Sequence, residues 1–256
     1  MEDTVQGGTT YRWAAVIAAL VALAVVIASL VIVFGIPRWF PGVAECQVTE
    51  GDGTVELSSE EAESAASVAA ASVRLRRPAE RTSAAVADVL DSSESDARIV
   101  AAALTGRAPH AFTCRHGGAD DEESDRLDRA GLTRRAANVR SDLDRAFGRQ
   151  KVGGFAPGGV RSGHMSGSAH YEGRAVDLFL RPVTRKNRVR GWAMAQYLVA
   201  HADRLAVNTV IFDGRIWTAR RADQGWRDYT PDTAGRSARV AAILEHLDHI
   251  HVDVAD

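Results

Sequence analysis

Lysine is nearly absent from this 256-residue chain. Of its 31 lysine and arginine residues, only Lys151 and Lys186 are lysine. Arginine and alanine are abundant instead, a bias that reflects a GC-rich genome more than a function. The formal net charge is only −2 at pH 7, so we expect no nucleic-acid partner. With 25% charged residues the chain is not disordered, and its length suits one ordinary core plus a smaller accessory unit.

Charged side chains are missing from residues 13–37. About 20 apolar residues are enough to cross a bilayer as a helix, whereas a signal peptide has an apolar region of roughly 7–15 residues and a small-residue cleavage site. Ala44-Glu45-Cys46 is a poor cleavage site, and a glutamate before the cysteine argues against a lipoprotein. The run therefore favours an uncleaved transmembrane signal anchor at residues 13–37 over a cleaved signal peptide.

Cysteine is scarce, because Cys46 and Cys114 are the only two and both follow the apolar run. A disulfide requires an oxidising compartment, so the pair favours an extracytoplasmic location; the alternative is two unrelated buried thiols. Arg12 and Arg38 flank the run symmetrically, so the positive-inside rule gives no orientation. We expect a single-pass cell-membrane protein, with residues 1–12 in the cytoplasm and the large domain, carrying a Cys46–Cys114 disulfide, outside.

Residues 41–115 have no cluster of metal ligands or nucleophiles, so we interpret them as a small helical region that is structural or a spacer. Pro78 is expected to end its first helix. The acidic run at residues 116–126 predicts a solvated linker. Helices are expected from residue 58 to Pro78 and at residues 82–90 and 95–104.

Residues 127–256 are expected to form a compact α+β domain with a small antiparallel sheet and flanking helices. Asp213-Gly214 is a strong turn signal for a hairpin. The expected elements are an amphipathic helix at 127–147, a strand at 175–180, a helix at 191–205, hairpin strands at 207–212 and 215–218, a helix at 236–245 and a closing strand at 249–254.

Two short motifs carry the chemistry. His170 and Asp177 are too far apart for one helical turn, so a loop that turns at Gly173 must bring them together. His249 and His251 alternate along the closing strand and therefore share a face. Two imidazoles and a carboxylate suit a catalytic zinc ion, which keeps its fourth position for water. The sequence predicts zinc held by His170, Asp177 and His251, with His249 beside it to take a proton or stabilise the intermediate.

The pattern Ser-x-His-x-x-Gly-x-Ala-x-Asp that begins at Ser168, followed by His-x-His from His249, resembles the LAS-type zinc peptidases. This group comprises D-Ala-D-Ala carboxypeptidases, murein endopeptidases and hedgehog-fold proteins. The likeness is closest to the C-terminal domain of membrane-anchored, cell-wall peptidase-like proteins of high-GC Gram-positive bacteria. It covers about residues 127–256 and implies a LAS/hedgehog-like fold there.

The resemblance also implies roles for particular residues. Carboxypeptidase members often place a glutamate base three residues before the last ligand, where this chain has Asp248. The histidine-rich arrangement is instead similar to the endopeptidase branch. By position, the implied zinc ligands are His170, Asp177 and His251, the active-site histidine is His249 with His246 nearby, Arg161 binds a substrate carboxylate or the oxyanion, and Ser168 contacts the substrate backbone.

Other features are expected to be ordinary. Surface or core roles are the simplest interpretation of His110, His116, His164 and His201. The same interpretation remains an alternative for Arg161 and His246. No Lys-Ser or Lys-Thr follows the glycines at residues 153–159, so a phosphate-binding loop is unexpected, and these glycines instead allow the chain to pass close to the cleft.

The sequence thus predicts a membrane-anchored, extracytoplasmic zinc metallopeptidase that hydrolyses peptidoglycan stem peptides or cross-links, as an endopeptidase or carboxypeptidase. The alternative is a catalytically inactive, zinc-containing module that binds peptidoglycan or acts as an envelope scaffold. Expected partners are peptidoglycan peptides, the membrane through a single span and, if residues 219–245 cover the cleft, a regulatory envelope partner.

Overall fold

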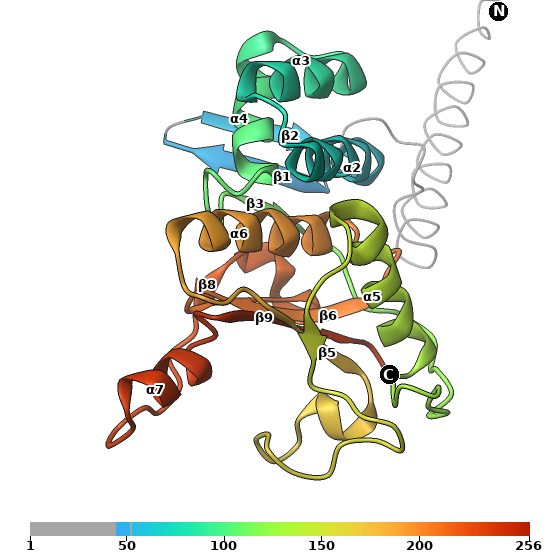
Figure 1. The fold of residues 1–256 in the computed structure, drawn as a ribbon. Coiled ribbons are helices and arrows are strands. Elements are labelled where there is room, and N and C mark those ends of the chain that lie inside the picture. The colour runs from blue at the N-terminus through green and yellow to red at the C-terminus, as the bar shows by residue number, and fades with distance from the viewer. Residues whose placement is uncertain (1–44, 52) are drawn as a thin grey trace, which may run out of the picture. The chain divides into compact units, whose positions relative to one another are not determined.

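The computed structural model describes residues 45–51 and 53–256, which belong to one compact unit. This part of the chain is α+β, with two antiparallel sheets (Figure 1). A three-stranded sheet and its helices form one layer, helix α6 (Arg185–Ala200) lies beneath it, and a six-stranded sheet follows. The two histidine motifs lie next to each other on the six-stranded sheet.

The predicted fold class needs a correction at its N-terminal end. Within residues 45–51 and 53–256, no helix has the length and apolar character that a membrane crossing requires. The expected span at residues 13–37, like the expected cytoplasmic segment 1–12, lies outside the described residues. The predicted single-pass membrane location, with its extracytoplasmic domain, is therefore not supported.

The region expected to be only helical contains a sheet. Strands β1 (Cys46–Glu50), β2 (Gly53–Leu57) and β3 (Phe112–Cys114) pair antiparallel in the order β2-β1-β3. Cys46 and Val48 alternate inward along β1, where they are 2% and 0% exposed. Strands this short give little periodicity between the much longer helices, and this explains why the sequence did not reveal them.

Three helices accompany this small sheet, of which the first and third contact it and the second packs on those two. They are α2 (Ser59–Leu75), α3 (Ala79–Leu90) and α4 (Glu94–Leu104), close to the predicted positions. Ser58 and Glu61 form a complete capping box at the start of α2. Because the buried face of α2 consists of alanines and one serine, neighbouring helices can approach closely. These residues are Ala62, Ala65, Ala66, Ala69, Ala70 and Ser72.

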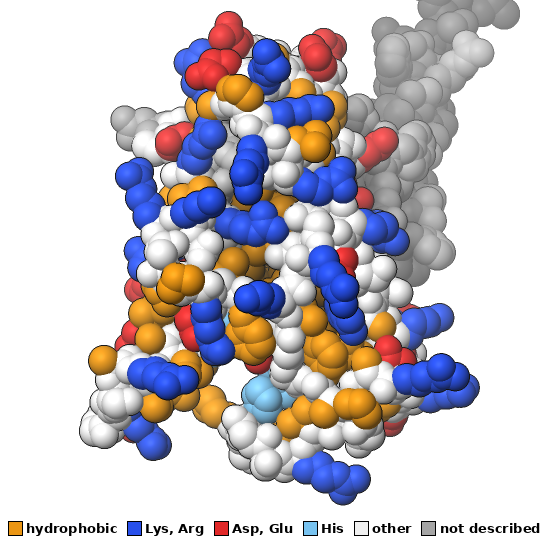
Figure 2. All heavy atoms as spheres, viewed as in Figure 1, with side chains coloured by type: hydrophobic (Ala, Val, Ile, Leu, Met, Phe, Trp, Pro, Cys, Tyr) orange, Lys and Arg blue, Asp and Glu red, His pale blue; other side chains and the backbone are white. Residues whose placement is uncertain are grey.

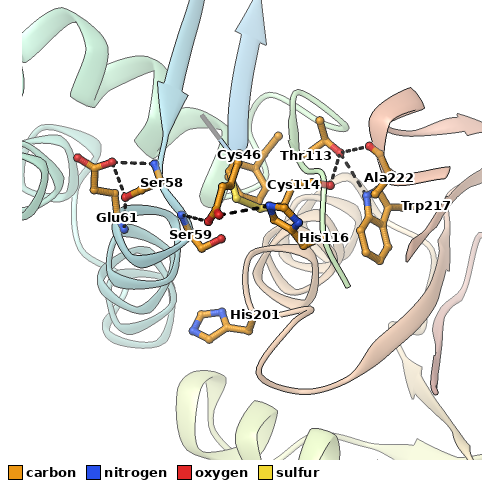
Figure 3. The surroundings of a disulfide bond; sticks show 12 residues. Cys46, Ser58, Ser59, Glu61, Thr113, Cys114, His116, His201, Trp217 and Ala222 are labelled. Atoms are coloured by element: carbon orange, nitrogen blue, oxygen red, sulfur yellow. Dashed lines mark hydrogen bonds and ion pairs between the residues drawn. A yellow bond between two sulfur atoms is a disulfide. The ribbon is translucent and has the colours of Figure 1, made fainter. Parts of the chain in front are cut away.

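The predicted disulfide is confirmed. Cys46 and Cys114 are bonded and lie directly opposite each other on β1 and β3 (Figure 3). Next to them, the Thr113 hydroxyl accepts from Trp217 Nε1 at 3.2 Å and donates to the Ala222 carbonyl at 3.4 Å. The disulfide region is thereby connected to β7 (Arg215–Thr218) and to the turn η2 (Ala219–Gln224).

Helix α6 is the central element of the described unit. Every residue from Gly191 to Ala200 is buried, as expected for a helix that is enclosed on all sides. A Cβ atom on Gly191 would lie 2.2 Å from the Phe212 ring, so close packing on the large sheet requires glycine there. On the other side, Gln196 accepts from the Phe112 amide at 3.0 Å and donates to the Ala103 carbonyl at 2.6 Å. One fully bonded polar side chain thus joins α6 to β3 and α4.

The large sheet has the strand order β4-β5-β9-β6-β7-β8, all antiparallel. The predicted hairpin of β6 (Val207–Phe212) and β7 is confirmed, with Asp213 and Gly214 at φ 52° and 70° as a tight turn of this kind requires. The closing strand β9 (His249–Val254) lies between β5 (Ala175–Phe179) and β6. The short edge strands are β4 (Val152–Gly153) and β8 (Arg227–Asp228).

The side chains of β5 and β9 point alternately to the two faces of the sheet, so one face belongs to the core and the other carries polar residues. Val176 and Leu178 on β5, with Ile250 and Val252 on β9, are at most 1% exposed and form the core face. Helices α5 (Arg134–Phe147) and α6 contact this part of the sheet. Successive side chains point to opposite faces, so the intervening polar residues of both strands share the other face.

The acidic run at residues 116–126 contains no helix or strand, yet it is firmly attached. The Glu123 side chain is 4% exposed and accepts from Arg134 Nε and the Arg135 amide, each at 3.1 Å. Gly118 donates to the Val207 carbonyl at 2.7 Å. A carboxylate at the first turn of α5 also stabilises that helix end, so this segment is bonded both to β6 and to the start of α5.

Loss of the disulfide is expected to destabilise the unit. The bond closes a loop of 68 residues, and removing such a constraint typically costs about 2–4 kcal/mol of unfolding free energy. The double substitution Cys46→Ser/Cys114→Ser tests this by urea denaturation monitored by circular dichroism. An unchanged midpoint would show that the bond contributes nothing to stability.

His201, at the end of α6, is expected to weaken the fold in acid. Its ring is 2% exposed, and burial lowers its pKa from 6.5 to about 4. The unfolded chain therefore binds a proton more readily than the folded chain. The contribution of the neutral His201 ring to the free energy of unfolding is complete above pH 6.5, and it falls by about 3 kcal/mol as the pH falls towards 4. The difference in unfolding free energy between wild type and His201→Gln should shrink by that amount from pH 7 to pH 4. A constant difference would contradict this role.

Candidate metal centre

The register of β5 against β9 builds the site. Asp177 pairs with His251 and Phe179 pairs with His249. Directly opposed residues in an antiparallel pair project to the same face with their Cβ atoms about 4.5–5.5 Å apart. The two strands therefore present one carboxylate and two imidazoles together on the sheet face opposite α6.

His170 reaches the same point from a separate segment. It belongs to η1 (Ala169–Glu172), which Ser168 caps and which ends at Gly173 in the left-handed conformation, φ 70°. This turn brings His170 Nε2 to 3.2 Å from Asp177 Oδ1 and 3.0 Å from His251 Nδ1. The structure thus brings together the three residues that the sequence predicted as metal ligands.

Outer hydrogen bonds orient both rings. His170 Nδ1 donates to the Gly154 carbonyl at 2.7 Å, so Nε2 faces Asp177. His251 Nε2 lies 3.3 Å from the Asp253 carboxylate, so Nδ1 faces inward, 3.4 Å from Asp177 Oδ1. Metal-binding histidines usually have such a carbonyl or carboxylate behind them, because it selects the tautomer that presents a lone pair to the ion.

Asp177 Oδ1 is a buried oxygen that has no hydrogen-bond partner, although both imidazoles lie close to it. Buried polar atoms without partners are rare and costly, and a cation among these nitrogens and this oxygen would satisfy it. Burial alone would raise the pKa of Asp177, but the adjacent His170 and His251 rings hold it well below its usual value. The carboxylate is therefore ionised, as a metal ligand must be.

His251 responds to the same surroundings. Burial would lower its pKa, but Asp177 and Asp253 outweigh burial and raise it to about 9. The ring then carries a proton at neutral pH. A metal ion that binds Nδ1 must displace this proton.

His164 is a member of the site that the sequence did not reveal. Its ring stacks on His170 with centroids 3.9 Å apart, and one ligand atom from each of His164, His170 and Asp177 lies within 4.8 Å of the others. Among the described residues this group could hold a metal ion. The Tyr171 hydroxyl holds the His164 backbone, accepting from its amide at 3.0 Å and donating to its carbonyl at 2.5 Å.

Two further histidines border the carboxylate. His249 Nε2 lies 3.9 Å from Asp177 Oδ1, while its Nδ1 donates to Asp248 Oδ1 at 2.7 Å. The His246 ring lies 4.6 Å from the His249 ring, and its Nδ1 donates to the Leu244 carbonyl at 2.9 Å. Burial, followed by repulsion from His249, lowers the pKa of His246 to about 3, so this ring stays neutral.

The histidines form the floor of a hollow of about 480 Å³. Figure 2 shows histidine side chains between two projecting segments, α7 (Ala238–Leu244) and the loop that precedes η1. Met165, 67% exposed, lies on the loop side, and Ile243 and Leu244 lie on the α7 side. The walls are largely apolar while the floor is polar, an arrangement typical of ligand sites.

The remaining predicted residues divide between two places. Ser168 lines the hollow. Arg161 is exposed and borders a separate depression together with Leu127 and Tyr171, so the structure does not bring it to the histidines. Arg181 is the only lysine or arginine among the residues lining the hollow. Its position four residues after Asp177, just beyond the end of β5, is a feature of the sequence that could have indicated its place near the site.

Glycine at position 154 is expected to be essential for metal binding. An added Cβ would lie 2.3 Å from His170 Cε1 and 3.0 Å from Asp177 Oδ2. Gly154→Ala should therefore weaken Zn²⁺ binding about 10–100-fold, measured by competition with a chelating dye. Gly158→Ala is the matched control, because Gly158 has a similar φ of 78° but no atom within 4 Å of its added Cβ. Equal losses in both variants would assign the effect to backbone strain alone.

Comparison with known proteins gives one match. Residues 128–240 are similar to a family described as the C-terminal domain of VldE. The matched segment covers less than half of the chain and includes His164, His170 and Asp177, but ends before β9. No curated protein and no solved structure matches the chain.

Proposed function

We propose that the chain is a zinc-dependent hydrolase that cleaves peptide bonds, with peptidoglycan stem peptides or cross-links as its substrate class. The observation that carries the proposal is the unpartnered, buried Asp177 Oδ1 beside the inward-facing nitrogens of His170 and His251. Two imidazole nitrogens and one carboxylate oxygen are a donor set that suits zinc and leaves a position for water.

The surrounding residues supply proton transfer. A bound zinc ion acts as a Lewis acid and lowers the pKa of a water molecule to about 7. His249 Nε2 faces the site, and in the neutral ring that donates from Nδ1 to Asp248 it carries no proton, so it can take the proton of the attacking water. The same nitrogen can then return the proton to the departing amine. Burial lowers the pKa of His246, so this ring is a poor proton acceptor at neutral pH.

A hydroxyl group supplies a hydrogen-bond donor at the rim. Tyr229 lines the hollow, and burial raises its pKa, so its hydroxyl stays protonated. This donor can stabilise the negative charge that develops on a scissile carbonyl. In this proposal Tyr229 takes the role that the resemblance implied for Arg161, which lies outside the hollow.

The walls suit a short peptide. Met165, Ile243 and Leu244 offer apolar surface, whereas Arg181 provides a positive charge at the rim. Peptidoglycan stem peptides combine small apolar side chains with free carboxylates, and the resemblance to LAS-type zinc peptidases favours them over other peptides.

The decisive experiment is mass spectrometry of purified peptidoglycan incubated with the full chain, once with Zn²⁺ and once with a chelator. New peptide termini that disappear with the chelator would support the proposal and identify the bond. An unaltered substrate, with protein that binds one zinc ion, would contradict hydrolysis and favour the inactive binding module.

His249 is expected to be needed for turnover but not for the metal. His249→Gln should lower kcat about 10²–10⁴-fold, the usual effect of removing a general base. Zinc content, measured by mass spectrometry of the native protein, should stay unchanged. His116→Gln is the control, because His116 is an exposed histidine on the segment after β3, outside the hollow. Loss of zinc from the His249 variant would instead make His249 a ligand.

A further inference from the structure

A chain of three side chains leads from the rim of the hollow to His249. Arg181 Nε donates to Asp248 Oδ2 at 2.6 Å, and His249 Nδ1 donates to Asp248 Oδ1 at 2.7 Å. His249 Nε2 then lies 3.9 Å from Asp177 Oδ1. Asp248 and His249 are 8% and 6% exposed, so these bonds are largely shielded from water.

We propose that Asp248 is a positioning residue that, held by Arg181, fixes His249 in the tautomer with Nδ1 protonated and Nε2 free towards the metal centre. The inference rests on the proposed function for the role of His249 in catalysis. The tautomer itself is a property of the folded chain.

Contacts with β5 and with the residues that follow it hold Asp248 in place. Its carbonyl accepts from the Leu180 amide at 2.8 Å, which places Arg181 directly beside it. The Arg181 guanidinium lies over the Phe179 ring, 4.4 Å from its centroid, and Phe179 is the strand partner of His249. Pairing of β5 with β9 therefore sets the distance between Arg181, Asp248 and His249.

Asp248 occupies the place where a glutamate base stands in the carboxypeptidases that the sequence resembles. Both of its oxygens are engaged, one by Arg181 and the other by His249. Its carboxylate therefore has no unengaged oxygen to offer a reacting water. The carboxylate acts through the imidazole, and His249 remains the group that exchanges the proton.

The substitution Asp248→Asn separates this role from simple packing. Arginine can only donate hydrogen bonds, so the amide oxygen must face Arg181 and the amide nitrogen must face His249. His249 Nδ1 then has to accept, which places the ring proton on Nε2. Nε2, which faces the metal centre, then has no free lone pair to accept a proton. We therefore expect kcat to fall about 10²–10⁴-fold, as when the equivalent carboxylate of a catalytic triad becomes an amide.

The test is a long-range ¹H–¹⁵N correlation spectrum of the full chain labelled at its histidines, recorded at about pH 8, above the ordinary histidine pKa of 6.5. The loss of signals in His249→Gln assigns His249. We expect Nδ1–H in the wild type and Nε2–H in Asp248→Asn. A wild type with Nε2–H overturns the proposal, whatever the Asp248→Asn variant shows.

A second substitution should reverse the effect. In Asp248→Asn/Arg181→Ala the amide is free to turn, so its oxygen can again accept from His249 Nδ1 and the wild-type tautomer should return. Asp228→Asn is the matched control, because this aspartate, 75% exposed, pairs with Arg215 on β7. An unchanged tautomer in Asp248→Asn, or one that changes equally in the control, refutes the proposal.

Activity measurements distinguish this proposal from the proposed function. If the tautomer changes as expected but wild-type protein hydrolyses no peptide, Asp248 is confirmed as a positioning residue and the hydrolase proposal fails. If wild-type protein is an active zinc peptidase and Asp248→Asn keeps full kcat, the positioning role fails while the hydrolase proposal stands.

Discussion

The antiparallel pairing of β5 with β9 is the constraint on which the rest of the structure depends. Its register places Asp177 opposite His251 and Phe179 opposite His249. A shift of β9 by one residue would turn His249 and His251 to the opposite face. The same shift would expose Ile250 and Val252, which are at most 1% exposed in the observed register. Burial of the apolar face beneath α5 and α6 therefore holds the polar face in place, and the stability of the core and the geometry of the site have one common cause.

Helix α6 transmits this constraint across the unit. Its residues from Gly191 to Ala200 are all buried, and it contacts both the large sheet through Gly191 and the small sheet through Gln196. On its flank, Tyr197 donates to Asp142 at 2.6 Å and thereby joins α6 to α5. Burial would raise the pKa of Asp142, but its bonds with Arg204, Tyr197 and Arg145 lower it to about 2, so this joint stays charged over most of the pH range. The helical layer and its disulfide therefore support the sheet that carries the histidines.

Local signals in the sequence were sufficient where they coincide with a regular element. Asp213-Gly214 predicted the hairpin because a tight turn needs positive φ at both residues, and the alternation of His249 and His251 predicted β9. Spacing alone could not place Arg161, since nothing local determines the path of the glycine-containing loop before η1. In the structure this loop places His164, and not Arg161, against His170. The small sheet was missed because its strands are short and pair over long distances in the sequence. In the apolar run, composition was the sole argument for a membrane helix.

The hydrogen bonds behind the histidines determine what the centre can accept. His170, His251, His249 and His246 each have a carbonyl or carboxylate at one ring nitrogen, from Gly154, Asp253, Asp248 and Leu244 in turn. In its neutral form each ring must then donate outward from that nitrogen and leave its other nitrogen as an acceptor. For three of these rings that acceptor lies within 4 Å of Asp177 Oδ1, which is itself an acceptor without a partner. Acceptors gathered in this way repel an anion and require a positive charge among them. Either a proton on His251 or a bound metal ion can supply this charge, and the metal ion must displace the proton to bind.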